Sequence, residues 1–401
     1  MTSKKDVKLN ILHNIYSVDR SIGGPIFSMS VIAENQAKLG HNVTIIAGQS
    51  KNHNNPVSFS KKIKLILIPC ITKFRYMVNW STNLLNLAEK PDVIHTYGIW
   101  TYHNYAAYKF AMKFGIPHII APCGMLVELG MRKSFFFKKI AWKIFQKEVL
   151  QNVSCFHAKS NRELKNISSI FPDLDIEIIP NPLSSVKKGQ SINDIFFLDK
   201  YTKDKNILLY IGRLDEQKGI IDLIDAWDRL VLRNLGWCLV LAGHDENKGF
   251  LNDMLNRINK HNNINCLNLN NALSPVKNIN LIITGPIYGE QKDIIYRNSD
   301  LFINPSSFEN FGMTIAEALS YNLPVIISKN TPWKLIEKQS CGWYLEEKNS
   351  NLYKILNKAL KHTKLELKTM GLNSSAITKK FDTVKVSNDV LSLYHKYIVS
   401  C

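Results

Sequence analysis

The feature that most constrains the fold is a repeated succession of a short apolar segment, a Gly-rich or polar turn, and a longer amphipathic segment. It occurs in two blocks. The strand-like segments of the first block are LNILHNIY, NVTIIAG, PDVIHTYG, PHIIAPCG and SCFHAKS, and those of the second are NILLYIGRL, WCLVLAGHD, NLIITGP, DLFINPSS and LPVIIS. Strands that alternate with helices are typical of parallel sheets. We therefore expect an α/β protein with two doubly wound domains.

A polar stretch between the blocks, residues 185–204, has no apolar periodicity and indicates a linker. The chain of 401 residues is long enough for two cores. We expect an N-terminal domain over residues 1–184 and a C-terminal domain over residues 205–380. Ligands of such sheets bind at the carboxyl ends of the strands, so we expect a site in the cleft between the two domains. The Asn-rich stretch 259–280 predicts an irregular surface connection.

Composition favours a cytoplasmic globular protein. Apolar runs such as residues 63–69 are strand-sized, well below the roughly 18 residues that a membrane span needs. The N-terminus has no apolar signal-peptide core. The seven cysteines are scattered and form no CxxC pair, which indicates free thiols in a reducing compartment.

The net charge of 51 − 33 = +18 implies an anionic partner: nucleic acid, an acidic membrane surface or a phosphorylated small molecule. No recognised nucleic-acid-binding motif accompanies the charge, so nucleic acid is not expected. The segment SIGGPIF is not a G-x-G-x-x-G fingerprint, and this disfavours a dinucleotide oxidoreductase.

The segment YIGRLDEQKG places Arg213 and Lys218 at the carboxyl end of a predicted strand. Arginine offers a planar fork for two phosphate oxygens, and lysine offers a compact charge. The pair could hold a diphosphate without a metal ion. The alternative is that Arg213 forms a surface salt bridge of little value with Asp215 or Glu216.

The segment ENFGMTIAE places Glu309 before, and Glu317 inside, a predicted helix over residues 313–320. The free N–H groups of a helix start bind anions, and Gly312 would let a ligand approach them closely. Carboxylates accept two hydrogen bonds from diols and so suit sugars. The alternative is that Glu317 lies on a solvent-exposed stripe and Glu309 only favours the positive end of the helix.

These motifs resemble those of retaining glycosyltransferases of the two-domain GT-B fold, glycosyltransferase family 4 (the group 1 transferases). The spacing of Glu309 and Glu317 is similar to the E-x7-E signature of that family. Further segments resemble family landmarks in the expected order: SIGGP, DVIHTYG, PCGML, HAKSNREL, IPNPL, GRLDEQKG and YNLPVIIS. The resemblance covers essentially the whole chain. It implies that the last helix, about residues 381–401, completes the N-terminal domain.

The resemblance also implies roles for individual residues. Glu309 would bind hydroxyls of the donor sugar and Glu317 the ribose. Arg213 and Lys218 would bind the diphosphate and stabilise the charge that grows on the leaving group. Further substrate-binding residues are expected in the glycine loop, in the loop before the helix and at strand ends: Gly23, Gly24, Asn310, Phe311, Gly312, His95 and Cys123.

Two of these positions raise separate questions. Many relatives have His or Arg where Cys123 stands, and cysteine cannot supply that charge. For His95, as for His157, the alternative is a structural histidine with its hydrogen bonds satisfied. The DLD at residues 173–175 is expected to be a surface turn, and no metal site or other cofactor is predicted.

Residues 131–151 form the most asymmetric segment. Lys139, Lys143 and Lys147 make one helical stripe, and an apolar stripe contains Phe137, Ile140, Ala141, Ile144 and Phe145. This pattern is typical of a helix in a membrane interface, and anionic lipids attract such lysines. The alternative is an ordinary amphipathic helix packed on the core.

The resulting hypothesis is a retaining, metal-independent glycosyltransferase that works on the inner face of the cytoplasmic membrane. It would move a hexose-type sugar from a UDP- or GDP-linked donor to a lipid-linked or lipopolysaccharide saccharide, in bacterial O-antigen, lipopolysaccharide or capsule synthesis. The alternative is a sugar-nucleotide epimerase of the same fold, which would need no acceptor site.

Overall fold

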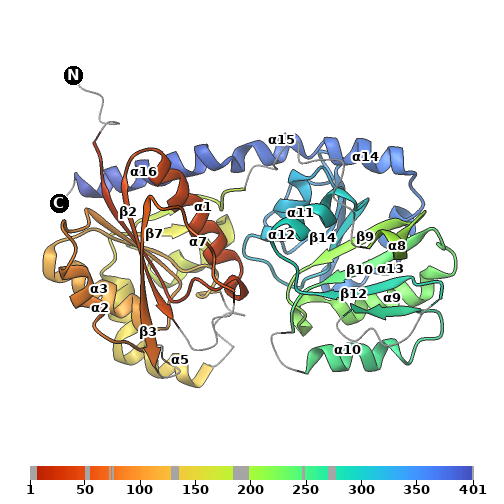
Figure 1. The fold of residues 1–401 in the computed structure, drawn as a ribbon, viewed down its shortest axis with the longest axis horizontal. Coiled ribbons are helices and arrows are strands. Elements are labelled where there is room, and N and C mark those ends of the chain that lie inside the picture. The colour runs from red at the N-terminus through yellow and green to blue at the C-terminus, as the bar shows by residue number, and fades with distance from the viewer. Residues whose placement is uncertain are drawn as a thin grey trace. The chain divides into compact units, whose positions relative to one another are not determined.

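The computed structural model describes residues 7–49, 55–71, 74, 76–127, 135–183, 198–245, 249–269 and 277–399. The chain forms two compact units (Figure 1). Unit 1 contains Met1–Ser184 together with Phe381–Cys401, and unit 2 contains Ser185–Lys380. Each unit is built on one mostly or wholly parallel sheet with helices around it, so the predicted fold class of two doubly wound α/β domains is confirmed.

Unit 1 has an eight-stranded sheet in the order β4-β3-β2-β1-β5-β6-β7-β8. Only the short β4 runs antiparallel, against β3. The strands are β1 (Asn10–Ile15), β2 (Asn42–Gln49), β3 (Ile63–Ile71), β4 (Tyr76–Met77), β5 (Val93–Tyr97), β6 (His118–Ala121), β7 (Cys155–Ala158) and β8 (Ile176–Ile178). Successive strands extend from β1 in one direction as far as β4 and then in the other direction from β5. The strand order therefore reverses between β1 and β5.

The helices of unit 1 include α1 (Gly24–Lys38), α2 (Trp80–Leu85), α3 (Tyr102–Phe114), α7 (Asn161–Ile170) and α16 (Thr383–Ile398). Between α3 and α7 lies a basic helical segment made of α5 (Phe135–Ala141), a π-helical turn (Trp142–Gln146) and α6 (Lys147–Gln151). Helix α16 begins where Asp382 caps the N–H groups of Val384 and Lys385. Its apolar residues, among them Val386, Val390 and Tyr394, join the core of unit 1.

Unit 2 has a seven-stranded parallel sheet in the order β11-β12-β10-β9-β13-β14-β15. The strands are β9 (Asn206–Ile211), β10 (Trp237–Ala242), β11 (Cys266–Asn268), β12 (Leu281–Gly285), β13 (Leu301–Asn304), β14 (Val325–Ser328) and β15 (Gly342–Leu345). Its helices are α8 (Asp199–Thr202), α9 (Ile220–Val231), α10 (Phe250–Ile258), α11 (Gly289–Arg297), α12 (Met313–Ser320), α13 (Leu352–Ala359), α14 (Lys364–Leu372) and α15 (Ser375–Thr378). Here the strand order reverses between β9 and β13.

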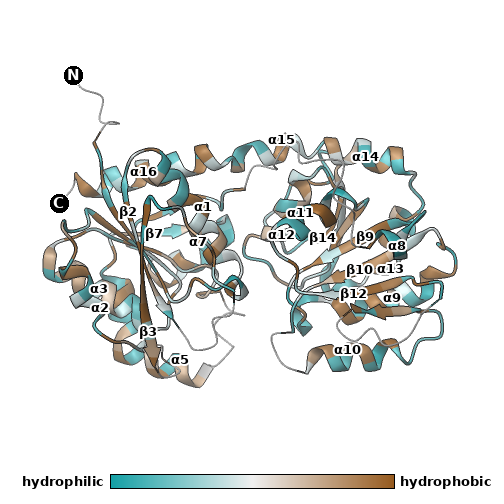
Figure 2. Ribbon diagram, in the orientation of Figure 1, coloured by the Kyte–Doolittle hydropathy of each residue, from teal (hydrophilic) through white to brown (hydrophobic). Residues whose placement is uncertain are grey.

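The central strands of unit 2 are almost entirely apolar because helices cover both faces of the sheet (Figure 2). The central strands of unit 1, β1 and β5, are equally buried but also contain polar residues, among them His13 and His95. All six residues of β10 are buried. Helix α9 packs Trp227, Leu230 and Val231 against this sheet in one core. Burial on both faces accounts for the apolar strands, and burial on one face accounts for the amphipathic helices.

Three local expectations need correction or restriction. Most of the predicted linker lies outside the described residues, but its end forms α8, and Leu198 just before it is fully buried. The Asn-rich connection 259–280 contains an edge strand, β11, which pairs with β12; residues 270–276 lie outside the described part. Strand β15 was not expected, and it extends the sheet beyond β14.

The six described cysteines are free thiols, as expected. Among the helices of the described ranges, none combines the length and the hydrophobicity that crossing a bilayer would need.

Candidate functional site

The predicted diphosphate loop and the predicted sugar loop lie together in unit 2. Residues 212–219 follow β9, and residues 305–312 follow β13. These two strands are neighbours, and the strand order reverses between them. In open α/β sheets such a reversal leaves a crevice at the carboxyl ends of the strands, where ligands bind.

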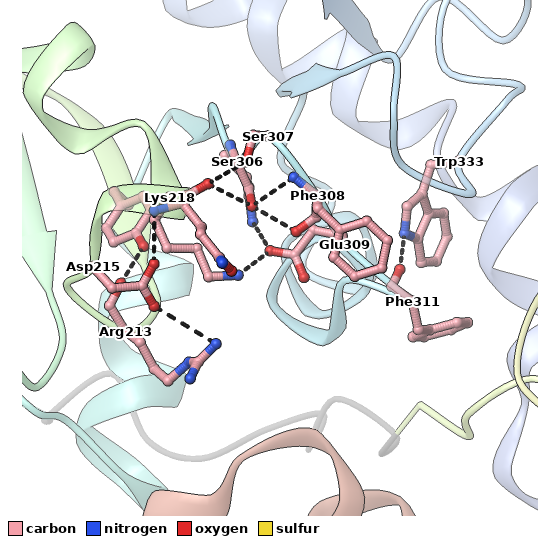
Figure 3. A network of polar contacts seen from close by, with 12 residues as sticks. Arg213, Asp215, Lys218, Ser306, Ser307, Phe308, Glu309, Phe311 and Trp333 are labelled. Atoms are coloured by element: carbon pink, nitrogen blue, oxygen red, sulfur yellow. Dashed lines mark hydrogen bonds and ion pairs between the residues drawn. The ribbon is translucent and has the colours of Figure 1, made fainter. Parts of the chain in front are cut away.

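Backbone contacts fix the two loops to each other (Figure 3). The N–H of Ser307 donates to the carbonyl of Gln217 at 2.9 Å, and the Ser306 hydroxyl donates to the same oxygen at 3.3 Å. Gly219 has a φ of +66°, and a Cβ atom there would come within 2.5 Å of the Pro305 carbonyl. Only glycine fits this close approach, so the packing of the loops requires Gly219.

Lys218 and Glu309 form an ion pair across the two loops. Lys218 Nζ lies 2.6 Å from Glu309 Oε1, and the side chains are only 12% and 16% exposed. Asn304, the last residue of β13, donates to the same oxygen at 3.2 Å. The limited exposure strengthens the attraction relative to a surface pair. Glu309 is therefore positioned by specific partners, and the interpretation that it only favours a helix end is insufficient.

Arg213 lies in the same loop as Lys218, with 38% of its side chain exposed. Tyr210 donates from its hydroxyl to the Arg213 carbonyl at 2.7 Å and so fixes the backbone. Burial, together with Glu309 and Asp215, raises the pKa of Tyr210 well above its usual value, so the phenol stays a donor. The predicted alternative contact exists, but Arg213 Nη2 is 3.6 Å from Asp215 Oδ2, a long distance for an ion pair.

The backbone from Asn310 to Gly312 enters α12 in a conformation that sequence reasoning did not explain. Gly312 has a φ of +79°. The Trp333 indole N–H donates to the Phe311 carbonyl at 2.6 Å, and the two rings pack edge to face at 5.3 Å (Figure 3). Trp333 thus holds the loop in place. No local pattern indicated this role, because its partner lies 22 residues earlier in the chain.

Glu317 lies about one turn into α12 and points at the neighbouring α11. Lys292 Nζ contacts both carboxylate oxygens, at 2.8 and 2.7 Å, and the Tyr296 hydroxyl donates to Oε2 at 2.9 Å. The Glu317 side chain is 25% exposed. Glu317 thus lies on the partly exposed side of α12 but is held by specific partners, and the sequence analysis missed its contacts with Lys292 and Tyr296.

In unit 1 the predicted residues lie at the carboxyl edge of the sheet. Gly23, with a φ of +76°, precedes α1, and Gly24 is its first residue. Cys123 follows β6 by two residues, has a φ of +56°, and donates from its thiol to the Ala121 carbonyl at 3.3 Å. Burial raises the pKa of this thiol to about 12, so it is neutral and unreactive.

His95 does not belong with these residues. It is fully buried in the middle of β5, and its Nδ1 lies 2.7 Å from the hydroxyl of Tyr394 on α16. His157 is also fully buried, with one ring nitrogen 3.2 Å from His95 and the other 2.8 Å from the Ile179 carbonyl. Burial lowers the pKa of both imidazoles well below the usual value. This is the environment of structural histidines, so the expected substrate contact of His95 needs correction.

The basic segment has a more divided surface than its sequence pattern predicted. Phe137 and Ile144 are 73% and 72% exposed, and Ile140 is 42% exposed, whereas Phe145 is only 8% exposed. Lysines 139, 143 and 147 are exposed. The single apolar stripe is therefore wrong for Phe145, which packs into the core; residues 131–134 lie outside the described part.

The DLD motif forms a turn before β8, as expected. The Tyr397 hydroxyl of α16 donates to Asp175 Oδ2 at 2.5 Å. Across the described residues, no three His, Cys, Asp or Glu side chains are grouped as metal ligands would be.

Two family descriptions match this chain in succession. "Glycosyl transferase 4-like domain" matches residues 23–182, and "Glycosyl transferases group 1" matches residues 192–370. Two uncharacterised glycosyltransferases of Methanocaldococcus jannaschii are 29% and 26% identical over 193 and 125 residues, or 48% and 31% of this chain. The aligned parts span only 40% and 27% of those two proteins.

A longer match is UDP-Gal:alpha-D-GlcNAc-diphosphoundecaprenol alpha-1,3-galactosyltransferase of Escherichia coli. It is 24% identical over 357 residues, which cover 84% of this chain and 85% of that protein. Among solved structures, HepE of Anabaena in complex with UDP and glucose has a TM-score of 0.72 at 16% identity, covering 97% of this chain and 100% of that one. WaaG, a glycosyltransferase involved in lipopolysaccharide biosynthesis, has a TM-score of 0.68 at 16% identity, with 96% and 99% covered. With the site motifs in place on this architecture, the chain belongs to the group 1 glycosyltransferases of the GT-B fold.

Proposed function

We propose that this protein is a retaining glycosyltransferase that transfers a hexose-type sugar from a UDP- or GDP-linked donor. The observation that carries the proposal is the contact between Lys218 and Glu309 at 2.6 Å. It joins a loop rich in phosphate-binding groups to a loop with a hydroxyl-binding carboxylate, at the strand-order reversal of unit 2. A nucleotide diphosphate sugar presents both chemical groups side by side.

In the proposed reaction, the bond between the anomeric carbon and the diphosphate oxygen breaks, and the nucleoside diphosphate leaves with the electron pair. The acceptor hydroxyl forms the new bond to the same carbon and loses its proton. Arg213, Lys218 and the backbone N–H groups at the start of α12 stabilise the charge on the leaving group without a metal ion. Glu309 holds sugar hydroxyls, and Glu317, fixed by Lys292, holds the ribose.

The relatives support this assignment of the donor and suggest the acceptor. HepE was solved with UDP and glucose, and the E. coli relative is named for a galactosyl transfer to a sugar on diphosphoundecaprenol. WaaG is described as acting in lipopolysaccharide biosynthesis. We extend the proposal to a lipid-linked or lipopolysaccharide saccharide as acceptor, in bacterial O-antigen, lipopolysaccharide or capsule synthesis.

A donor screen with membrane extract as acceptor, read by mass spectrometry, tests the reaction. Arg213→Ala, Lys218→Ala and Glu309→Gln should each lower transfer by about a hundredfold or more, because each removes a contact to the charged or sugar part of the donor. Glu216→Gln is the matched control, since Glu216 is exposed in the same loop.

Circular dichroism should show the same fold in all four variants. Normal transfer by Arg213→Ala would overturn the diphosphate assignment. Turnover of the nucleotide sugar without any acceptor would instead indicate a sugar-nucleotide epimerase.

The basic segment supports a peripheral position on the inner face of the cytoplasmic membrane. Exposed Phe137, Ile140 and Ile144 lie on a helix with the exposed lysines 139, 143 and 147. Such apolar side chains enter the headgroup region, and each lysine adds about 1 kcal/mol of attraction to anionic lipid.

Sedimentation with vesicles of phosphatidylglycerol and phosphatidylcholine tests this membrane contact. Replacing Lys139, Lys143 and Lys147 by Glu should abolish co-sedimentation. The control is the same charge change at the exposed Lys354, Lys358 and Lys361 of unit 2. Equal association of the wild type and the first variant would show that the basic segment does not bind membranes.

A further inference from the structure

We propose that Trp100, together with Trp142, forms the subsite that binds a sugar ring of the acceptor, on unit 1. The inference rests on the proposed function, because it concerns the acceptor of the same transfer. The donor-binding side chains named in the proposed function, Arg213, Lys218, Glu309 and Glu317, all lie in unit 2, so we assign a further sugar site on unit 1 to the acceptor.

The position of Trp100 is that of a ligand-binding residue in a doubly wound sheet. It follows β5, next to the point where the strand order of unit 1 reverses between β1 and β5. At this edge a Cβ atom on Gly98 would lie 3.2 Å from Met125, after β6, and 3.6 Å from Tyr16, after β1. Loops from three adjacent strands thus meet around Gly98, two residues before Trp100, in the place where such sheets bind ligands.

The backbone of Trp100 is held in an unfavourable conformation. Its φ is +76°, a region that bulky L-residues rarely adopt. The Trp100 N–H donates to Gln146 Oε1 at 2.7 Å, and Gln146 is fully buried in the π-helical turn. Local strain of this kind persists where the surrounding structure enforces it, and it is concentrated at functional sites, as are π-helical turns.

The side chain of Trp100 is presented as part of an aromatic surface. Trp100 and Trp142 are each partly exposed, and their ring centroids lie 6.1 Å apart at 40°. The Trp100 indole N–H points to the Met125 carbonyl at 3.4 Å, which fixes the ring plane. An indole face is apolar and rigid, so it suits the C–H face of a pyranose ring.

Lys138 places a charge over the ring of Trp100. Its Nζ lies 5.6 Å from the centroid of the Trp100 ring. A cation in this place favours a sugar that carries a phosphate, which is the linkage found in lipid-linked saccharides. The expected ligand is therefore a hexose or N-acetylhexosamine with a phosphate on its anomeric carbon.

Saturation-transfer NMR with water-soluble probes tests the subsite. The probes are the methyl glycosides and the 1-phosphates of glucose, galactose, mannose and N-acetylglucosamine. The wild type should bind at least one sugar, and the 1-phosphate more tightly than the methyl glycoside. Trp100→Gly should weaken this binding by about tenfold or more, since glycine adopts the backbone conformation but has no ring.

Three further variants separate a binding role from a structural one. Trp100→Phe keeps an aromatic face and should retain part of the binding, and Trp142→Ala should weaken it. Tyr353→Ala is the control. Tyr353 is a partly exposed aromatic residue of unit 2, and the Arg229 guanidinium lies 4.4 Å from its ring centroid. Thermal unfolding followed by circular dichroism should show that each variant is folded.

Absence of binding by the wild type to every probe, or unchanged binding by both Trp100→Gly and Trp142→Ala, would overturn the proposal. Titration with UDP and GDP, followed by calorimetry, examines the donor site separately. If neither nucleotide binds but a sugar does, the donor assignment fails while the Trp100 subsite stands.

Discussion

At the residue scale, the candidate site of unit 2 contains an ion pair between Lys218 and Glu309, whose side chains are mostly buried. Lys218 and Glu309 are 91 positions apart, yet the motif of each was sufficient to single it out. The structure adds that they contact each other, which neither motif showed. Each side chain compensates the charge of the other where both are largely buried.

The coupling between Lys218 and Glu309 can be measured as stability. Lys218→Ala removes the cation that pairs with the Glu309 carboxylate and leaves the hydrogen bond from Asn304. The variant should lower the free energy of unfolding by about 1 to 2 kcal/mol. In the double variant Lys218→Ala/Glu309→Ala the loss should be smaller than the sum of the single losses. Urea unfolding of the four proteins gives the cycle, and strict additivity would show that the pair contributes nothing to the fold.

The residues that position the site were not predictable in the same way. Trp333 fixes the Phe311 carbonyl, and Lys292 fixes Glu317, but both act on partners in other elements. Their side chains are of types that occur in any α/β domain, and nothing in their local sequence distinguishes them. Asn304 is the exception, since a polar residue at the end of a buried strand could have been singled out.

At the element scale, the basic segment shows how a small change in helical geometry alters a surface. The Lys147 N–H donates to the Trp142 carbonyl, five residues earlier, so this turn is wider than an α-helical turn. The extra residue rotates the following side chains relative to a regular helix. Within this turn Ile144 is exposed and its neighbour Phe145 is buried against the core.

This division predicts opposite effects for two adjacent substitutions. Ile144→Asp should leave the free energy of unfolding within about 0.5 kcal/mol and reduce vesicle binding, because the side chain is exposed. Phe145→Ala should lower the free energy of unfolding by about 3 kcal/mol through loss of core packing. Urea unfolding and vesicle sedimentation of both variants provide the comparison. Equal destabilisation would contradict the exposed position of Ile144.

Secondary structure could be predicted where the pattern of neighbouring residues defines an element without help from distant parts of the chain. Helix α12 has the predicted bounds, 313–320, because its apolar positions and the preceding glycine define it locally. Strands β11 and β15 were missed, because three- and four-residue strands at the sheet edges carry little sequence signal and depend on pairing with β12 and β14.

At the scale of the whole molecule, the two units differ in their buried histidines. His13, His95, His118 and His157 are all in unit 1 and almost fully buried. Burial lowers the pKa of His13 to about 4 and of His118 to about 3, from an ordinary value of 6.5. Burial also lowers the pKa of His95 and His157 well below that value, and neighbouring cationic groups, Lys159 among them, act in the same direction.

These pKa shifts predict that unit 1 loses stability in mild acid. Above pH 6.5 the histidines are neutral in the folded and unfolded chain alike, so their burial does not make the free energy of unfolding depend on pH. Between pH 6.5 and about 4 the unfolded chain binds protons that the folded unit 1 does not, and stability falls as pH falls. Each histidine can contribute a slope of up to about 1.4 kcal/mol per pH unit.

Urea unfolding at pH 7.5 and pH 5, with hydrogen exchange to locate the unfolding region, measures this effect. Unit 1 should become the first part to unfold at pH 5. His118→Gln should reduce the pH dependence, because it removes one of the titrating groups. An unfolding midpoint that does not change between the two pH values would contradict buried neutral histidines.

The α/β class and the two blocks could be read from the sequence, which also singled out Arg213, Lys218, Glu309 and Glu317 as candidate site residues. Strand-length apolar runs and the local chemistry of loops at strand ends encode these features within a few neighbouring residues. The fold was needed to show that Lys218 contacts Glu309, that Trp333 binds the Phe311 carbonyl and Lys292 binds Glu317, and that His95 is buried against Tyr394. Such contacts depend on where the sheet order brings distant strands together, and no local pattern contains that information.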